Sequence, residues 1–103
     1  MNTYAVLKGR CPPQTFPRLL IEVLGEGDDY QLCIEEERKT IGVVDSGANL
    51  GVWYDVESRE LEIMVLVSWQ EAENPTEAEE VARILRLGKT LGLGLRVAGV
   101  ELL

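Results

Sequence analysis

The chain has 103 residues, of which 46% are hydrophobic and 27% charged, and its 18 acidic and 10 basic residues give a formal net charge of −8. It contains no histidine, which removes the commonest catalytic base and the commonest zinc ligand. The acidic balance argues against a nucleic-acid binder, because such proteins hold phosphates with lysine and arginine. We therefore expect one folded domain over residues 1–103, with no metal, cofactor or nucleic acid.

The first residues, MNTYAVLKGR, lack the pattern of a secretory signal, and no apolar run approaches the length of a membrane span. These features favour a cytoplasmic protein with no membrane partner. Cys11 and Cys33 are 22 residues apart, with no CxxC spacing and no histidine nearby. We expect both to be reduced structural thiols.

The first half of the chain contains one clear strand and one ambiguous segment. Residues 3–8 predict a strand, which Gly9 and two prolines close. In the next segment five apolar residues have helical spacing, and Gly25 can end the helix. These residues are Phe16, Leu19, Leu20, Val23 and Leu24. The alternative is a hairpin in which residues 19–24 and 30–35 flank the turn 25–29. We favour the helix because Pro17 suits a first helical turn.

The second half predicts strands, one long helix and a last strand. Residues 30–36, 40–45 and 50–55 are short strand segments, and 61–69 is apolar on both faces over 63–67, as in a central strand. Asn74 can cap a helix that begins at Pro75 and ends at Gly88 or Gly92. Its expected inward face is Ala78, Val81, Ala82, Leu85 and Gly88. The last strand is residues 95–103, with Gly99 marking a bulge.

The resulting order, β-α-β-β-β-β-α-β, predicts an α+β fold. It resembles an expanded ferredoxin-like two-layer sandwich, in which a mainly antiparallel sheet carries two helices on one face. If the first helix is wrong, the alternative is an antiparallel sheet with one C-terminal helix.

Two short motifs suggest chemistry but lack its requirements. Gly88-Lys89-Thr90 looks like part of a phosphate-binding loop, but Arg83 stands where that loop needs a glycine, and the segment closes a helix. Residues 45–49, DSGAN, are typical of a turn between strands, and a serine nucleophile there would have no histidine as its base. We predict no catalytic, cofactor-binding or metal-binding residue.

Acidic residues are concentrated between positions 22 and 37, where seven acids occur without a base. We treat this stretch as a candidate acidic interaction surface, formed by Glu22, Glu26, Asp28, Asp29, Glu35, Glu36 and Glu37. Adjacent glutamates on a strand point to opposite faces and cannot converge on one ion, so solvated charge at a sheet edge is favoured over metal binding.

A second candidate surface is apolar. A stripe at helical spacing beside the expected core face, together with the second face of the strand 61–69, could mediate a homodimer. The residues are Met64, Leu66, Ile84, Leu87 and Leu91.

These observations favour a non-enzymatic protein-binding or regulatory module that acts through a protein partner or through self-association. One alternative is an acidic inhibitor or immunity-type protein, which blocks a basic partner or mimics nucleic acid. Another is a small enzyme that uses carboxylates or the Cys11 thiol.

Overall fold

The computed structural model describes residues 3–24, 30–35, 40–45, 50–67 and 75–102. Its elements are β1 (Thr3–Arg10), α1 (Phe16–Leu24), β2 (Tyr30–Glu35), β3 (Thr40–Asp45), β4 (Leu50–Asp55), β5 (Glu60–Val67), α2 (Pro75–Leu91) and β6 (Arg96–Leu102). This order confirms the sequence prediction, and α1 is a helix rather than the arm of a hairpin. No helix among these residues is long and apolar enough to cross a membrane.

The strands form one sheet in the order β2-β3-β4-β5-β1-β6, and every neighbouring pair is antiparallel. Four strands therefore follow one another as a meander, and β1 lies between β5 and β6. α1 and α2 each connect two strands that run parallel but are not neighbours. The α+β class is confirmed, and the sheet has two strands more than the four of the ferredoxin-like β-α-β-β-α-β unit.

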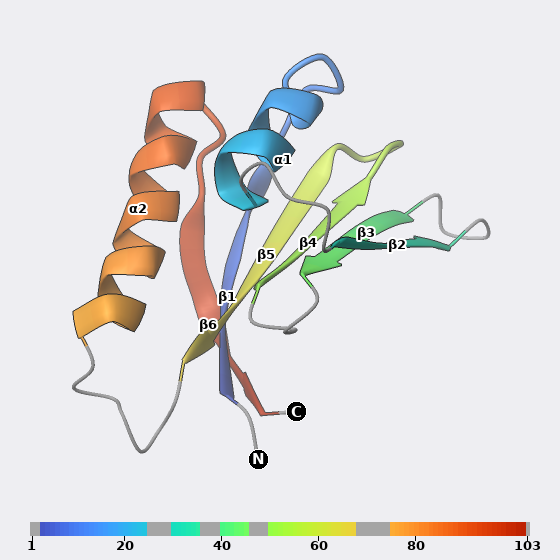
Figure 1. Ribbon diagram of the computed structural model, residues 1–103. Coiled ribbons are helices and arrows are strands. Elements are labelled where there is room, and N and C mark those ends of the chain that lie inside the picture. Colours follow the sequence, from blue (N-terminus) through green and yellow to red (C-terminus); the bar gives the residue numbers. More distant parts are fainter. Residues whose placement is uncertain (1–2, 25–29, 36–39, 46–49, 68–74, 103) are drawn as a thin grey trace.

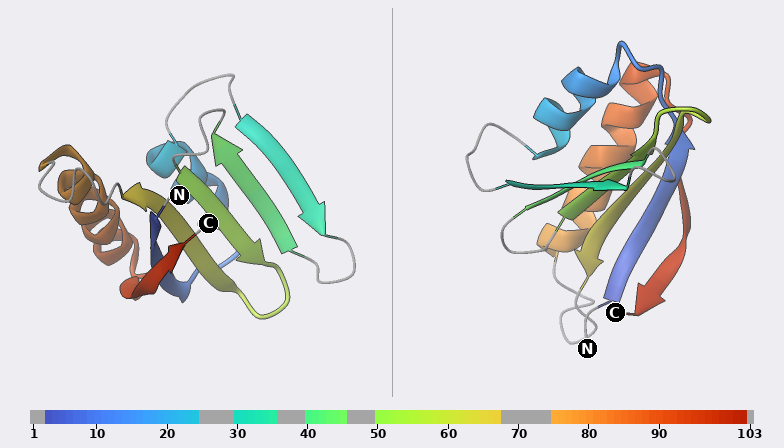
Figure 2. Two further views of the ribbon diagram at one scale, coloured as in Figure 1. Left: turned by 90° about the horizontal axis from the view of Figure 1, so that it is seen from below. Right: turned by 90° about the vertical axis from the view of Figure 1, so that its right-hand side faces the viewer.

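Both helices cover the same face of the sheet, and the other face has no helix on it (Figures 1 and 2). The core lies between the layers. It includes Leu7 of β1, Leu19 of α1, Ile63 of β5 and Ile84 of α2, each fully buried. β5 lies between β1 and β4, which agrees with the central position predicted from its two apolar faces.

The inward face of α2 differs from the expected one. It is centred on Ile84, which is fully buried, with Val81 and Leu85 on one side and Leu87 and Leu91 on the other, all partly buried against the core. Gly88 is also buried. Leu95 packs closely against it, since a Cβ at residue 88 would lie 2.9 Å from the Cβ of Leu95. The predicted face was therefore rotated by about one residue from the true one.

α2 ends in a turn that directs the chain into β6. The Leu93 N–H donates to the Gly88 carbonyl oxygen at 2.9 Å, and the Gly92 N–H donates to the Lys89 carbonyl oxygen at 3.2 Å. This is the Schellman pattern, which needs a left-handed residue after the helix, and Gly92 has φ 70°. Of the two predicted stops, Gly92 is therefore the real one.

Candidate functional site

The face of the sheet opposite the helices, called the helix-free face below, carries a row of residues in register across five strands. From β6 to β3 the row is Arg96, Lys8, Glu62, Trp53 and Gly42. These residues share a face because antiparallel partners that stand opposite each other point to the same side of a sheet. Basic residues therefore occupy one end of the row, followed by an acid and then an aromatic ring.

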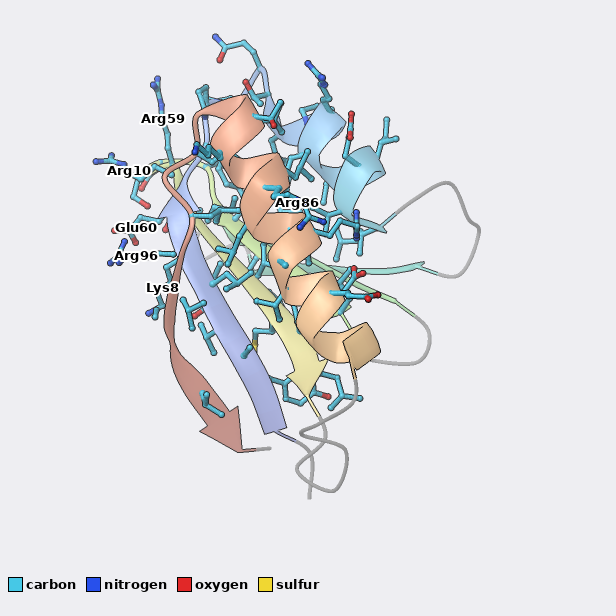
Figure 3. All side chains as sticks on the ribbon, turned by 90° about the vertical axis from the view of Figure 1, so that its left-hand side faces the viewer. Lys8, Arg10, Arg59, Glu60, Arg86 and Arg96 are labelled. Carbon is cyan, nitrogen blue, oxygen red and sulfur yellow. The ribbon has the colours of Figure 1, made fainter. Side chains whose placement is uncertain are left out.

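A shallow hollow of about 1030 Å³ opens at this row. Its lining comes from the end of β1, the β4–β5 turn, neighbouring positions of β4 and β5, and the loop between α2 and β6. Figure 3 shows Lys8, Arg10, Glu60 and Arg96 side by side along this part of the molecule, all directed away from the helices. Acids on the same hollow include Asp55, Glu57 and Glu62.

Backbone hydrogen bonds connect the three segments at the rim of the hollow. The Arg10 N–H donates to the Leu93 carbonyl oxygen at 3.0 Å, and the Cys11 N–H donates to the Arg59 carbonyl oxygen at 2.9 Å. The Arg10 guanidinium also donates from Nη2 to the Ser58 carbonyl oxygen at 2.9 Å. The end of β1 therefore holds both the β4–β5 turn and the α2–β6 loop in place.

The β4–β5 turn is built around one carboxylate. Oδ1 of Asp55 accepts hydrogen bonds from the backbone N–H of Glu57 at 2.9 Å and of Ser58 at 3.0 Å, as in an Asx-turn. Arg59 then adopts φ 65°, a conformation that costs free energy for a residue other than glycine. Its N–H donates to the Asp55 carbonyl oxygen at 2.8 Å, which closes the turn.

The charges on the hollow are only partly paired. Lys8 Nζ lies 3.8 Å from Glu62 Oε1, and both side chains are solvent-accessible. Arg96 is exposed, and its side chain makes no ion pair or hydrogen bond with any residue that the structure describes. All the N–H donors of its guanidinium are therefore available to bind an anionic group of a partner.

The side chain of Trp53 packs against the neighbouring strand, where its ring lies over Gly42. Trp53 Cη2 is 2.8 Å from the place a Cβ of residue 42 would occupy, so a side chain there would displace the ring. Trp53 is partly buried, and it also lines the hollow. An aromatic ring held in this way loses little conformational entropy when a partner packs against it.

Two buried titratable residues lie next to each other at this site, Tyr54, which lines the hollow, and Cys11, whose carbonyl oxygen Tyr54 contacts. The Tyr54 hydroxyl donates to the Cys11 carbonyl oxygen at 2.6 Å, and the Cys11 thiol donates to the Pro12 carbonyl oxygen at 3.4 Å. Burial raises the pKa of both the Cys11 thiol and the Tyr54 phenol. Cys11 is thus a free, buried thiol, as predicted, and its thiolate form is disfavoured.

The predicted acidic surface falls mostly outside the described residues. This applies to Glu26, Asp28, Asp29, Glu36 and Glu37, as it does to the side chains of Cys33 and of Glu35 in β2. Glu22 is exposed on α1, where its Oε1 lies 3.5 Å from Nε of Arg18. Within the described ranges no three of the Cys, Asp and Glu side chains gather as metal ligands.

The predicted apolar interface does not form one surface. Ile84 is fully buried, and Leu87 and Leu91 are partly buried and pack against the core. Met64 and Leu66 are partly buried on the helix-free face, opposite Val6 and Tyr4 of β1. The combined surface was therefore wrong, because the two groups lie on opposite sides of the sheet and Ile84 belongs to the core.

The residues that gather at the hollow were not singled out from the sequence. A signal was present, since Lys8 and Arg10, and also Glu60 and Glu62, alternate along their strands.

Comparison with known proteins gives no match: no family model, no curated protein and no solved structure is significantly similar to the chain.

Proposed function

We propose that the protein is a non-enzymatic binding module that recognises a protein partner through the hollow on the helix-free face. The observation that carries the proposal is the row from Arg96 to Trp53, which combines separated charges with a positioned aromatic ring. Interfaces are enriched in arginine and tryptophan, and these residues often dominate the binding energy. We retain the cytoplasm as the predicted location.

The distribution of charge specifies the kind of partner. Basic side chains come from β1 and β6, and acidic side chains come from β5 and the β4–β5 turn. The complementary surface carries an acidic group to meet Arg96, a basic group to meet Glu60, and an apolar group beyond the basic one for Trp53. Separated charges of this kind fix the orientation of the partner more than they add affinity.

The hydrogen-bonded rim of the hollow favours a preformed binding surface over a catalytic site that must change conformation. The hydrogen bonds of Arg10, Cys11 and Arg59 hold the three rim segments before any partner arrives. Preorganisation reduces the entropy lost on association. The nearby buried thiol is a poor nucleophile, because burial raises the pKa of Cys11.

The test uses a photo-activated cross-linking amino acid at Lys8, which is exposed on the helix-free face, and at Arg86, which is exposed on α2. In the cells that make the protein, we expect a covalent adduct with a defined protein from position 8 and none with that protein from position 86. Adducts with the same protein from both positions, or only from position 86, would contradict the proposal.

Once the adduct protein is purified, its affinity should depend on the row. We expect Trp53→Ala to weaken binding by about 2 kcal/mol, the range of an interface hot spot. Arg96→Glu should weaken binding and reduce its dependence on salt, whereas Arg86→Glu should change neither. Equal effects of the two arginine variants would mean that the affinity depends only on the net charge of the protein, which would contradict the proposed site.

A further inference from the structure

β6 forms one border of the sheet. It pairs with β1 on one side, and no described strand pairs with its other side. The right-hand view of Figure 2 shows no described element beyond this border. Such an edge presents backbone N–H and C=O groups to any strand that can align with it.

The helix-side face of β6 is apolar and uncovered. Val97 is 53% exposed and Val100 is 58% exposed, although they are in register with the core residues Leu7 and Ala5. A second, more apolar hollow of about 610 Å³ lies between α2 and β6, and its lining includes Leu85, Leu95 and Val97. α2 therefore leaves apolar surface at this edge that a further layer of protein could cover.

A bulge gives β6 an unusual side-chain pattern. Gly99 pairs with Val6 and Val97 pairs with Leu7, so Ala98 is an additional residue. In a regular strand two residues three positions apart point to opposite faces. The additional residue places Val97 and Val100 on the same side.

This pattern is complementary to itself. When two β6 strands run antiparallel with residue 97 of one opposite residue 100 of the other, valine meets valine on the helix side at both positions. In the same alignment residue 96, which pairs with Lys8, comes opposite residue 101, which pairs with Tyr4, so positions of the helix-free face also meet positions of that face. Shifting the alignment by one residue in either direction places residues of opposite faces against each other.

We propose that the protein forms a twofold dimer in which the β6 strands of two copies pair antiparallel, with Val97 of each copy opposite Val100 of the other. The occupant of the edge is a second copy because the strand is complementary to itself: both exposed helix-side positions are valines, and in this alignment each faces the other. The two six-stranded sheets become one, and both helix layers lie on the same side of it. This inference does not depend on the proposed function.

The first test measures the mass in solution by light scattering and the dissociation constant by analytical ultracentrifugation. We expect a mass twice the 11.5 kDa of the chain. Val100→Asp should raise the dissociation constant about 100-fold, since a twofold interface contains each change twice and each costs about tenfold. Val100 is exposed in the single chain, so circular dichroism should show an unchanged fold.

Ile21→Asp on α1 is the matched control, because Ile21 is also 58% exposed. It should leave the dissociation constant unchanged. A monomer at all concentrations, with the bulge keeping the edge unpaired, would overturn the proposal. So would a dimer that Ile21→Asp disrupts and Val100→Asp does not, or a series of growing oligomers, which pairing of β6 with β2 of another copy would produce.

The second test determines the register. Val97→Cys and Val100→Cys proteins, mixed and oxidised, should form a disulfide between positions 97 and 100, because opposite residues on paired strands lie about 5 Å apart. Either variant alone should cross-link poorly, since equal positions are offset along the strand by the span from Leu7 to Ala5 of β1, about 7 Å, in addition to the spacing between strands. The unsubstituted protein reports the background from native thiols. Equal cross-linking by a single variant and by the mixture would refute this register.

Discussion

The hydroxyl of Tyr54 allows the contribution of one buried hydrogen bond to be measured. Tyr54 is 2% exposed, and its hydroxyl donates to the Cys11 carbonyl oxygen at 2.6 Å. Its ring stacks on Phe16, with 4.2 Å between ring centroids and 18° between planes. Tyr54→Phe removes the donor and keeps the ring, so the change in stability reports the hydrogen bond and not the packing.

The expected loss follows from burial of the acceptor. Cys11 is 0% exposed, so its carbonyl group has little access to water that could replace the hydroxyl. An unsatisfied buried polar group costs about 1–3 kcal/mol, and we expect about 1.5 kcal/mol for this variant. For a domain of this size such a loss lowers Tm by about 8 °C.

Thermal and urea unfolding followed by circular dichroism would measure this loss. The control is Thr90→Val, which removes a hydroxyl that donates to the Arg86 carbonyl oxygen at 3.0 Å in an exposed position. It should change the free energy of unfolding by less than about 0.5 kcal/mol. Equal losses for the two variants would refute the argument that burial gives the Tyr54 hydrogen bond its larger contribution.

Three further predictions follow from described contacts. Because burial raises the pKa of the Cys11 thiol and the Tyr54 phenol above their ordinary values of 9.0 and 10.0, the unfolded chain releases these protons first. Stability should therefore be retained below pH 9 and fall as the pH rises above it, measured by urea unfolding. Arg83→Met should lower stability by about 1 kcal/mol and increase amide exchange in α1, because the Arg83 guanidinium donates to the carbonyl oxygens of Glu22 and Val23, at 2.9 and 3.0 Å. Gly42→Ala should shift the tryptophan emission spectrum, because the new methyl group displaces the Trp53 ring.

Each of these predictions has its own control. The fall above pH 9 should become smaller in Cys11→Ala, and an unchanged pH profile in that variant would show that another group is responsible. Arg83→Lys should not restore stability, since one ammonium lacks the planar fork that reaches two carbonyl oxygens. Gly99→Ala should leave the emission unchanged, because no atom lies within 4 Å of the added carbon.

The predicted elements were recovered because their signals are local. The apolar residues of α1 recur at helical spacing, and Phe16, Leu19 and Val23 are the buried ones. Gly92 ends α2 because only a residue that tolerates a positive φ fits that turn. The bulge beside Gly99 was also visible as a glycine within a strand pattern.

The prediction for the α2 stripe failed for a reason that spacing cannot reveal. A helical period shows which side chains share a face, but the packing partner decides which face is inward. Gly88 permits close approach of Leu95, and Ile84, one turn earlier in the helix, is buried in the core. The stripe of Ile84, Leu87 and Leu91 thus became part of the packing layer.

By itself, the sequence determined the order of elements, the α+β class and the alternation of charged residues along β1 and β5, since these depend on residues close together in the chain. Only the tertiary structure decided which residues meet. Arg96 stands beside Lys8, and Lys8 beside Glu62, because β1 inserts between β5 and β6. Pairing between distant segments is set by burial of the whole sheet face against the helices, and no local pattern contains that information.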